Sequence, residues 1–327
     1  MTVLVTGATG HIGVNLVRAL CAAKRTVRAL VRGKASSLRD LPIEFASGDI
    51  LDDDSLVRAM NGVEVVYHLA AQVSLDRRRE GEMERTNIEG TRNVAAACLE
   101  CGVKRLVHFS SIHALSAEPV GEVIDETRTL AKGGDALPYD RTKAAGEREI
   151  AAAMNRGLDA VTVNPTAVIG PFDYRLSHMG EVILLLLKRR LPALVKGGFN
   201  WVDVRDVAAG ALAAEARGRK GERYLLGGHY CSVVELAALV EEISKVKRPR
   251  FTAPISLALF GAPFAATYCR LIGQRPLFTA ASVRTLQRHQ QISCRKAETE
   301  LDYTPRPLRE TIGDTIEWFR SAGMIDG

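Results

Sequence analysis

The stretch "VTGATGHIG" (residues 5–13) separates an apolar run at 2–6 from an amphipathic segment at 13–24, and so marks the junction of a strand and a helix. Its glycines are Gly7, Gly10 and Gly13. Glycines at such a junction let the backbone turn tightly and approach a pyrophosphate, which then lies at the positive end of the helix dipole. A second apolar run, "TVRALVR" (26–32), follows the helix. A bare glycine pattern is weak, but within a strand–helix–strand unit it predicts a dinucleotide-binding turn.

The alternation of strands and helices continues beyond this unit. The sequence predicts strands over 43–50, 63–71, 104–111 and 159–165, with helices over 53–61, 82–101 and 139–156 between them. Alternation of this kind builds a doubly wound parallel sheet with helices on both faces, the Rossmann architecture of the α/β class.

The regular alternation of predicted strands and helices stops near residue 170, and the rest of the sequence predicts a looser mixture of helices and loops. We expect a nucleotide-binding domain over 1–170 and a smaller, mostly helical substrate lobe over 171–198 and 228–327. The segment 199–227 predicts a strand, a helix and a second strand that return to the first domain.

Composition and cysteine spacing are typical of a soluble globular enzyme with reduced cysteines. The chain has 327 residues, of which 46% are apolar and 25% charged, as in a soluble globular enzyme. Its six cysteines are scattered and no secretion signal precedes them, so we expect reduced thiols and a cytoplasmic location. Cys98 and Cys101 form a CxxC without a second pair, which favours buried small side chains over a zinc site. We therefore predict no metal ion.

The net charge of +6 arises from short basic clusters at 76–80, 188–190, 217–220 and 245–250. These clusters are dispersed and lack interleaved aromatic residues, so we interpret them as solvated faces and expect no nucleic-acid partner. The most apolar stretch, 253–273, is interrupted by two prolines and a glycine and contains Arg270, so it does not predict an integral membrane span. We expect a pair of cap helices there, with association at a membrane surface as the alternative.

The end of the second predicted strand distinguishes the two nicotinamide cofactors. A carboxylate about 20 residues beyond the glycine turn accepts from the ribose hydroxyls of NAD, whereas a cation accommodates the 2′-phosphate of NADP. Here the strand ends at Arg32, followed by Gly33 and Lys34 without an acid. The sequence favours NADP(H), and NAD(H) remains the alternative if Arg32 only stacks on adenine or faces solvent.

The helix predicted over 139–156 carries Tyr139 and Lys143 near its start. Four residues are about one helical turn, so the phenol and the ammonium lie on the same face and can reach one bound molecule. An ordinary exposed helix face is the alternative, because this spacing is common.

Taken together, the motifs resemble those of the extended short-chain dehydrogenases/reductases, and the likeness runs essentially end to end. The motifs are "TGATGHIG" at 6–13, "GDI" at 48–50, "HLAA" at 68–71, "NIEGT" at 87–91, "FSS" at 109–111, the YxxxK of Tyr139 and Lys143, and "NPTAVIGP" at 164–171. The segment "NPTAVIGPFDYRLSHMG" and the tail "KAETELDYTPRPLRETIGDTIEWF" look like the dihydroflavonol-4-reductase-like and 3β-hydroxysteroid-dehydrogenase-like bacterial reductases.

The resemblance implies an oxidoreductase in which Tyr139 gives or takes the proton of a carbonyl or alcohol oxygen. Lys143 would bind the nicotinamide ribose and lower the pKa of the phenol, which is near 10 in free tyrosine. A serine at the end of the preceding strand would donate or accept a second hydrogen bond. The family pattern assigns this role to Ser111, although the register could slip by one to Ser110.

The resemblance also implies which residues contact the cofactor and the substrate. The cofactor residues are Gly7, Thr9, Gly10, His11, Ile12, Gly13, Arg32, Lys34, Asp49, Ile50, Leu69, Ala70, Ala71, Asn87, Tyr139, Lys143, Pro165, Thr166 and Ala167. The substrate residues are Ser74, Ile112, His113, Phe172 and Ile183. The apolar run at 182–187 would form a wall for an apolar, mid-sized carbonyl substrate, or else pack the core of the lobe. A homodimer through the helices at 82–101 and 139–156 is also expected.

Two other functions remain open at this point. A sugar-nucleotide epimerase or dehydratase of the same family usually carries an acid after the second strand and a run like "GDGxQxRxF", which this chain replaces with "VKGGFN" (195–200). An NADP-sensing regulatory protein on this fold usually lacks the catalytic tyrosine. Both are therefore less favoured than a reductase.

Overall fold

The computed structural model describes residues 1–74, 77–133, 136–271 and 279–325. At its centre is a seven-stranded sheet in the order β10-β6-β5-β4-β1-β2-β3, in which every pair of neighbours is parallel. The strands are β1 (Thr2–Thr6), β2 (Thr26–Val31), β3 (Glu44–Ser47), β4 (Val65–His68), β5 (Arg105–Phe109), β6 (Ala160–Pro165) and β10 (Arg223–Leu226). The strand order reverses between β1 and β4, which confirms the doubly wound Rossmann sheet and puts its ligand crevice at their carboxyl ends.

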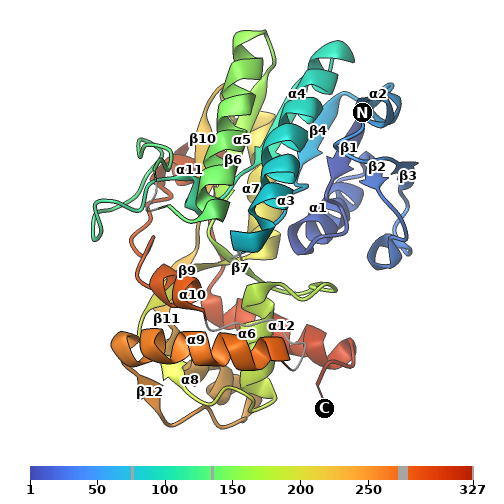
Figure 1. Cartoon of the computed structure of the whole chain (residues 1–327). Coiled ribbons are helices and arrows are strands. Elements are labelled where there is room, and N and C mark those ends of the chain that lie inside the picture. The colour runs from blue at the N-terminus through green and yellow to red at the C-terminus, as the bar shows by residue number, and fades with distance from the viewer. Residues whose placement is uncertain (75–76, 134–135, 272–278, 326–327) are drawn as a thin grey trace.

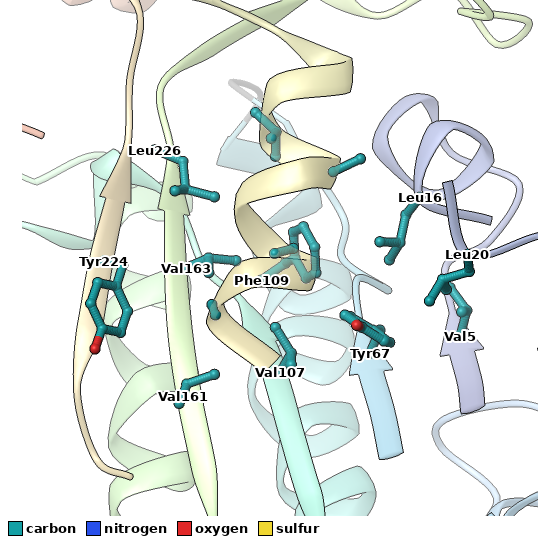
Figure 2. Close-up of a cluster of buried hydrophobic side chains, with 14 of the residues drawn as sticks. Val5, Leu16, Leu20, Tyr67, Val107, Phe109, Val161, Val163, Tyr224 and Leu226 are labelled. Carbon is teal, nitrogen blue, oxygen red and sulfur yellow. The ribbon is translucent and has the colours of Figure 1, made fainter. Parts of the chain in front are cut away.

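Helices cover both faces of this sheet (Figure 1). The helices α1 (His11–Ala22) and α7 (Val204–Arg217) lie on one face. Figure 2 shows part of the core on this face, where Leu16 and Leu20 of α1 lie near side chains of the strands such as Val5. The other face is covered by α2 (Asp53–Met60), α4 (Gly90–Glu100) and α5 (Pro138–Asn155). Within β5, Val107 and Phe109 belong to the first core and Leu106 to the second, because successive side chains of a strand point to opposite faces.

The predicted helix at 82–101 is divided into three parts. The chain passes from α3 (Glu80–Glu84) through a π-helical turn (Arg85–Glu89) into α4. Short 3₁₀ turns occur at Ser36–Leu38, Arg77–Arg79 and Ile112–Ala114.

The second lobe lies at the carboxyl end of the large sheet (Figure 1). It contains a three-stranded sheet of β11 (His229–Ser232), β9 (Gly198–Asp203) and β7 (Ala167–Ile169), and a small pair of β12 (Thr252–Ala253) and β8 (Leu194–Val195). Its helices are α6 (His178–Leu187), α8 (Val233–Ser244), α9 (Ile255–Leu271), α10 (Ala280–Thr285) and α12 (Leu308–Ser321).

Three expectations about the division of the chain need correction. The strand at 198–203 does not return to the large sheet, because β9 pairs with β7 and β11. Only α7 and β10 return. The helix α11 (Arg295–Leu301) belongs with the large sheet, since Ala297 and Leu301 pack in the core under α1 and α7. Finally, 255–271 is one continuous helix and not a pair, although Pro263 lies within it. Its start packs against neighbouring segments of the chain through Ile255, Ala258 and Leu259; residues 272–273 of the apolar stretch lie outside the described residues.

Across the described ranges, no helix has the length and apolar character needed to span a membrane. Within the same ranges, no three His, Cys, Asp or Glu side chains are grouped so that they could hold a metal ion. Cys98 is buried, with its sulfur 4.0 Å from that of Met60.

Candidate active site

The glycine turn fits tightly between the ends of β1 and β4. Gly7 has φ +69°, and a Cβ there would lie 2.6 Å from the backbone nitrogen of Ala70. A Cβ on Gly13 would lie 2.3 Å from the carbonyl oxygen of Gly7. Only glycine is compatible with both positions, because real Cβ atoms do not approach other atoms this closely.

The turn leaves the start of α1 open to an anion. Gly10 is the N-cap and forms no side-chain cap, and the first turn of the helix carries no acidic residue. The first amide groups of a helix need partners that this cap does not supply, and a pyrophosphate would supply them. The turn therefore fits a dinucleotide.

His11, in the same turn, is directed toward the small lobe. Its Nε2 lies 3.1 Å from the carbonyl oxygen of Pro171, and its Nδ1 lies 3.9 Å from a carboxylate oxygen of Asp173. Asn15 donates to the same Pro171 carbonyl at 3.0 Å. His11 thus holds the loop that leads into the small lobe, and Ile12 packs against the core beneath the turn.

The expected cofactor discriminators lie at the ends of β2 and β3. The side chain of Arg32 is 78% exposed, and Lys34 is exposed beside it. Asp49, after β3, places a carboxylate oxygen 3.7 Å from the Arg32 guanidinium. An acid thus lies beside Arg32, although it follows β3 and not β2. Ile50 is buried in the core under α4.

Asn87 connects the exit of β4 to α5. Its Oδ1 accepts from the backbone N–H of Gln72 at 2.8 Å, and its Nδ2 donates to the Gln72 carbonyl and to Thr142 Oγ1, both at 3.0 Å. Asn87 lies in the π-helical turn, an irregularity that is frequent at functional sites. These bonds fix the loop that carries Leu69, Ala70 and Ala71.

The structure joins Ser111, and not Ser110, to Tyr139. Ser111 caps the 3₁₀ turn after β5, where its Oγ accepts from the N–H of His113 at 3.2 Å, and it also forms a side-chain hydrogen bond with Tyr139. The Ser110 Oγ is buried and has no hydrogen-bond partner among the described residues. Asn164 at the end of β6 donates to the Ser111 carbonyl at 3.0 Å and so fixes this loop.

The pKa of Tyr139 shifts in the opposite direction from our expectation. Burial raises the pKa of this phenol to about 12, although the Ser111 hydrogen bond opposes the shift. The prediction of a lowered pKa was wrong for this structure, because burial outweighs the Ser111 hydrogen bond. The Lys143 ammonium donates instead to the carbonyl oxygen of Phe109 at 2.7 Å. Tyr139 is therefore a neutral phenol with a proton to give.

Lys143 is held in an unfavourable environment for a cation. Only 4% of the residue is exposed, and burial lowers the pKa of its ammonium to about 8, while the negative charge of Glu147 opposes this shift. Glu147 is itself buried, accepting from Asn164 Nδ2 at 2.7 Å and pairing with Arg223 at 2.9 Å. Sequence reasoning missed Glu147, although its position four residues after Lys143 puts it on the same helix face.

A second group of charged residues lies beside Tyr139. The Nδ1 atom of His113 is 3.2 Å from a carboxylate oxygen of Asp140, whose other oxygen is 3.6 Å from Arg288. Burial raises the pKa of Asp140, but the hydrogen bond and charge of His113 outweigh it, so that the net shift is downward. The His113 ring is 5.8 Å from that of Tyr139 and 5.0 Å from that of His289, centroid to centroid. Sequence reasoning missed Arg288 and His289, which arrive from the far end of the chain.

The expected substrate residues do not all lie near this centre. His113 is beside Tyr139, but Ile112 is only 3% exposed and Ile183 is fully buried in the core of the small lobe. Phe172 stacks under the Arg18 guanidinium at 4.0 Å and faces Trp318. We therefore assign Ile112, Ile183 and Phe172 to packing.

The remaining expected contacts are also placed in the structure. Most of the run at 182–187 packs the core of the small lobe, the alternative that the sequence left open. Ser74 is buried after β4. Thr166, between Pro165 and Ala167, bonds Asn200 at 3.1 Å, and Thr9 is partly buried in the glycine turn.

Comparison with known proteins extends this picture. Residues 3–227 match the model of the NAD dependent epimerase/dehydratase family. The chain is 38% identical to sterol demethylase protein B of Methylococcus capsulatus, over 99% of this chain and all of that protein. It is 34% identical to a Synechocystis protein provisionally named dihydroflavonol 4-reductase, over 98% and 95% of the two chains.

Solved structures agree with these matches. The crystal structure of gox2253 covers 99% of both chains with a TM-score of 0.86 and 34% identity. The structure of PA4631, a nucleoside-diphosphate-sugar epimerase from Pseudomonas aeruginosa, covers 100% of this chain and 99% of that one, with a TM-score of 0.81 and 26% identity. With the Rossmann sheet, the glycine turn and these matches in place, the chain belongs to the NAD dependent epimerase/dehydratase family, the extended short-chain dehydrogenases/reductases, and is an NAD(P)-dependent oxidoreductase.

Proposed function

We propose that this protein is an NADP(H)-dependent reductase of a ketone or aldehyde on an apolar, mid-sized substrate, or oxidises the matching alcohol. The observation that carries the proposal is the Tyr139 phenol, hydrogen-bonded to Ser111, with Lys143 one turn away. These residues lie at the carboxyl end of the sheet, where a nucleotide on the glycine turn would also lie.

The bound cofactor supplies or accepts the hydride in this proposal. Tyr139 donates a proton to the carbonyl oxygen, and its raised pKa keeps that proton in place at neutral pH. Ser111 donates a hydrogen bond to the same oxygen. Lys143 holds the nicotinamide ribose, and the glycine turn holds the pyrophosphate.

Arg32 and Lys34 support NADP over NAD. Both side chains are exposed at the end of β2, where a 2′-phosphate would meet them. Asp49 competes for Arg32 at 3.7 Å, but an exposed ion pair at that distance is weak, so the guanidinium can turn to a phosphate.

The names of the relatives support a reductase of apolar substrates. Beyond the two proteins above, they include a farnesyl-dihydroquinoline oxide ketoreductase, 29% identical, and cinnamoyl-CoA reductase 1 of Oryza sativa, 30% identical. The likeness to PA4631 favours a sugar-nucleotide epimerase as the second candidate.

The test is a screen of the purified protein with NADPH and with NADH against aldehydes, ketosteroids, flavanonols and acyl-CoA esters. A reductase consumes NADPH in proportion to the carbonyl that it reduces. An epimerase converts a UDP-sugar with no net change in cofactor, and a sensor binds NADPH without turnover. Either of these last two results would contradict the proposal.

A further inference from the structure

One end of the small lobe combines unpaired cations with exposed apolar side chains. We call it the lobe tip, and it consists of Lys188, Arg189, Arg190, Lys196, Lys245, Lys247, Arg250, Phe251, Leu257, Phe260 and Phe264. The pairing of β12 with β8 brings its parts together. The backbone N–H of Leu194 donates to the Phe251 carbonyl at 3.0 Å, and the backbone N–H of Lys196 donates to the Ala253 carbonyl at 3.4 Å. Figure 1 shows β12 beside the start of α9.

The apolar part of the lobe tip lies on α9. The inner face of this helix carries Ile255, Ala258 and Leu259, which pack against Val283 of α10 and Leu286 at its C-cap. The outer face carries Leu257, Phe260 and Phe264, which are 48%, 73% and 69% exposed. The rings of Phe260 and Phe264 contact each other, with centroids 5.9 Å apart.

The outer face of α9 is therefore unusual for a helix in contact with water. A surface helix normally presents charged or polar residues opposite its buried stripe. From 254 to 264 the chain has no charged residue, and Ser256 is its only polar side chain. The spacing from 257 to 264 gives an apolar strip about 10 Å long.

The cationic part of the lobe tip has seven side chains, all exposed. None of the seven forms an ion pair with another residue in the described parts of the chain, whereas the neighbouring Arg248 pairs with Glu241 and Glu242 pairs with Arg309. The chain has 44 basic and 38 acidic residues. Seven of these 44 basic residues thus belong to the lobe tip.

We propose that the lobe tip docks this protein on an anionic lipid surface, with the cations at the headgroup phosphates and the outer face of α9 in the acyl boundary. Lipid headgroups and acyl chains offer both kinds of contact to one face of a protein. A nucleic acid would engage the cations but leave the strip on α9 in water. A second copy of the chain would bring seven like charges against these seven, and such repulsion opposes a symmetric interface.

Docking would also place the membrane near the candidate active site. The helix α9 packs on α10 through its inner face. Four residues beyond the end of α10, the ring of His289 contacts the ring of His113, which lies beside Tyr139. A substrate dissolved in the bilayer would then be close to the site. The proposal itself does not depend on the catalytic assignment.

The test is co-sedimentation of the full-length protein with vesicles of phosphatidylcholine, alone or mixed equally with phosphatidylglycerol. We expect binding to the mixed vesicles and little to phosphatidylcholine alone, with a strong loss in 0.5 M NaCl. Each cation near an anionic surface strengthens binding about fivefold, so the pair Lys247→Glu and Arg250→Glu should weaken it at least about 25-fold. The pair Lys24→Glu and Arg58→Glu, with the same charge change on the Rossmann domain, should have little effect.

The apolar contribution is tested separately. The pair Phe260→Gln and Phe264→Gln should weaken binding at least about tenfold, because both rings would be withdrawn from the acyl boundary. The matched control pair, Val120→Gln and Val123→Gln, changes side chains that are 61% and 56% exposed elsewhere. Circular dichroism checks that each variant folds.

Three results would overturn the proposal. The wild-type protein could fail to sediment with the mixed vesicles, or the control pairs could weaken binding as much as the lobe-tip pairs. Light scattering could also show a dimer that Phe260→Gln and Phe264→Gln convert to a monomer, in which case the face is covered by a second copy.

Discussion

Replacing Lys143 with Met should stabilise the cofactor-free protein while abolishing its activity. In the folded chain the ammonium is charged at pH 7, yet it is buried and its pKa is lowered from 10.5 to about 8. Lowering the pKa from 10.5 to about 8 corresponds to roughly 3 kcal/mol of destabilisation at pH 7. Met has a similar length and no charge, so the substitution removes that cost.

The substitution also removes one hydrogen bond. The Phe109 carbonyl oxygen loses the Lys143 donor at 2.7 Å, which costs about 1 kcal/mol. The net gain in the free energy of unfolding is therefore about 2 kcal/mol at pH 7. For a chain of this size, we expect the midpoint of thermal unfolding to rise by a few degrees.

The dependence on pH provides the decisive measurement. Below pH 8 the lysine is protonated in both the folded and the unfolded chain, so the full cost applies. Between about 8 and 10.5 the folded chain has released the proton while the unfolded chain retains it, so the wild-type protein gains stability as the pH rises. The advantage of the Met variant should therefore shrink over that interval.

The assay is thermal unfolding of both proteins without cofactor at pH 7, 8, 9 and 10. The exposed Lys24→Met change is the control and should leave the midpoint unchanged. If Lys143→Met lowers the midpoint at pH 7, or if its advantage is constant across the pH series, then burial of the ammonium is not the cost that we infer.

Four further predictions concern catalysis and the cofactor. Tyr139→Phe should reduce carbonyl reduction by about a hundred- to ten-thousand-fold with NADPH binding unchanged, and near-normal turnover would remove Tyr139 from its role. Ser111→Ala should lower kcat while Ser110→Ala should not, because only the Ser111 hydroxyl bonds Tyr139; the reverse result would shift the register by one. Arg32→Asp should weaken NADPH more than NADH in fluorescence titrations, and equal losses would count against the NADP assignment. The kcat/KM for NADPH should fall as pH rises through about 8, where Lys143 loses its charge, and a flat profile to pH 9 would contradict this.

Most of the fold could be predicted from the sequence because its signals are local. The glycine turn between an apolar run and an amphipathic run identifies β1 and α1, and the alternation that follows locates every strand of the large sheet. One further strand, β9, was wrongly added to that sheet, because the apolar pattern in "FNWVD" (199–203) fits either sheet. Its partners, β7 and β11, are themselves too short to be recognised from composition.

The candidate site was only partly predictable, because several of its properties depend on residues distant in sequence. The spacing of Tyr139 and Lys143 is local, and the motif at 109–111 gave the serine. In contrast, His289 reaches His113 from 176 residues away, which no spacing rule reveals. The pKa of Tyr139 depends on how much water the fold excludes from the phenol, and the sequence carries no direct sign of that.

The position of α5 is linked to the buried environment of Lys143, one of the two proposed catalytic side chains. A Cβ on Gly146 would lie 2.6 Å from the carbonyl oxygen of Asn87, so the absence of a side chain lets α5 approach the π-helical turn closely. Gly146 is three residues after Lys143 and therefore lies near the same side of the helix. The close approach presses Lys143 onto the end of β5, where Phe109 accepts its hydrogen bond. The ammonium is buried at this position, and its burial lowers its pKa.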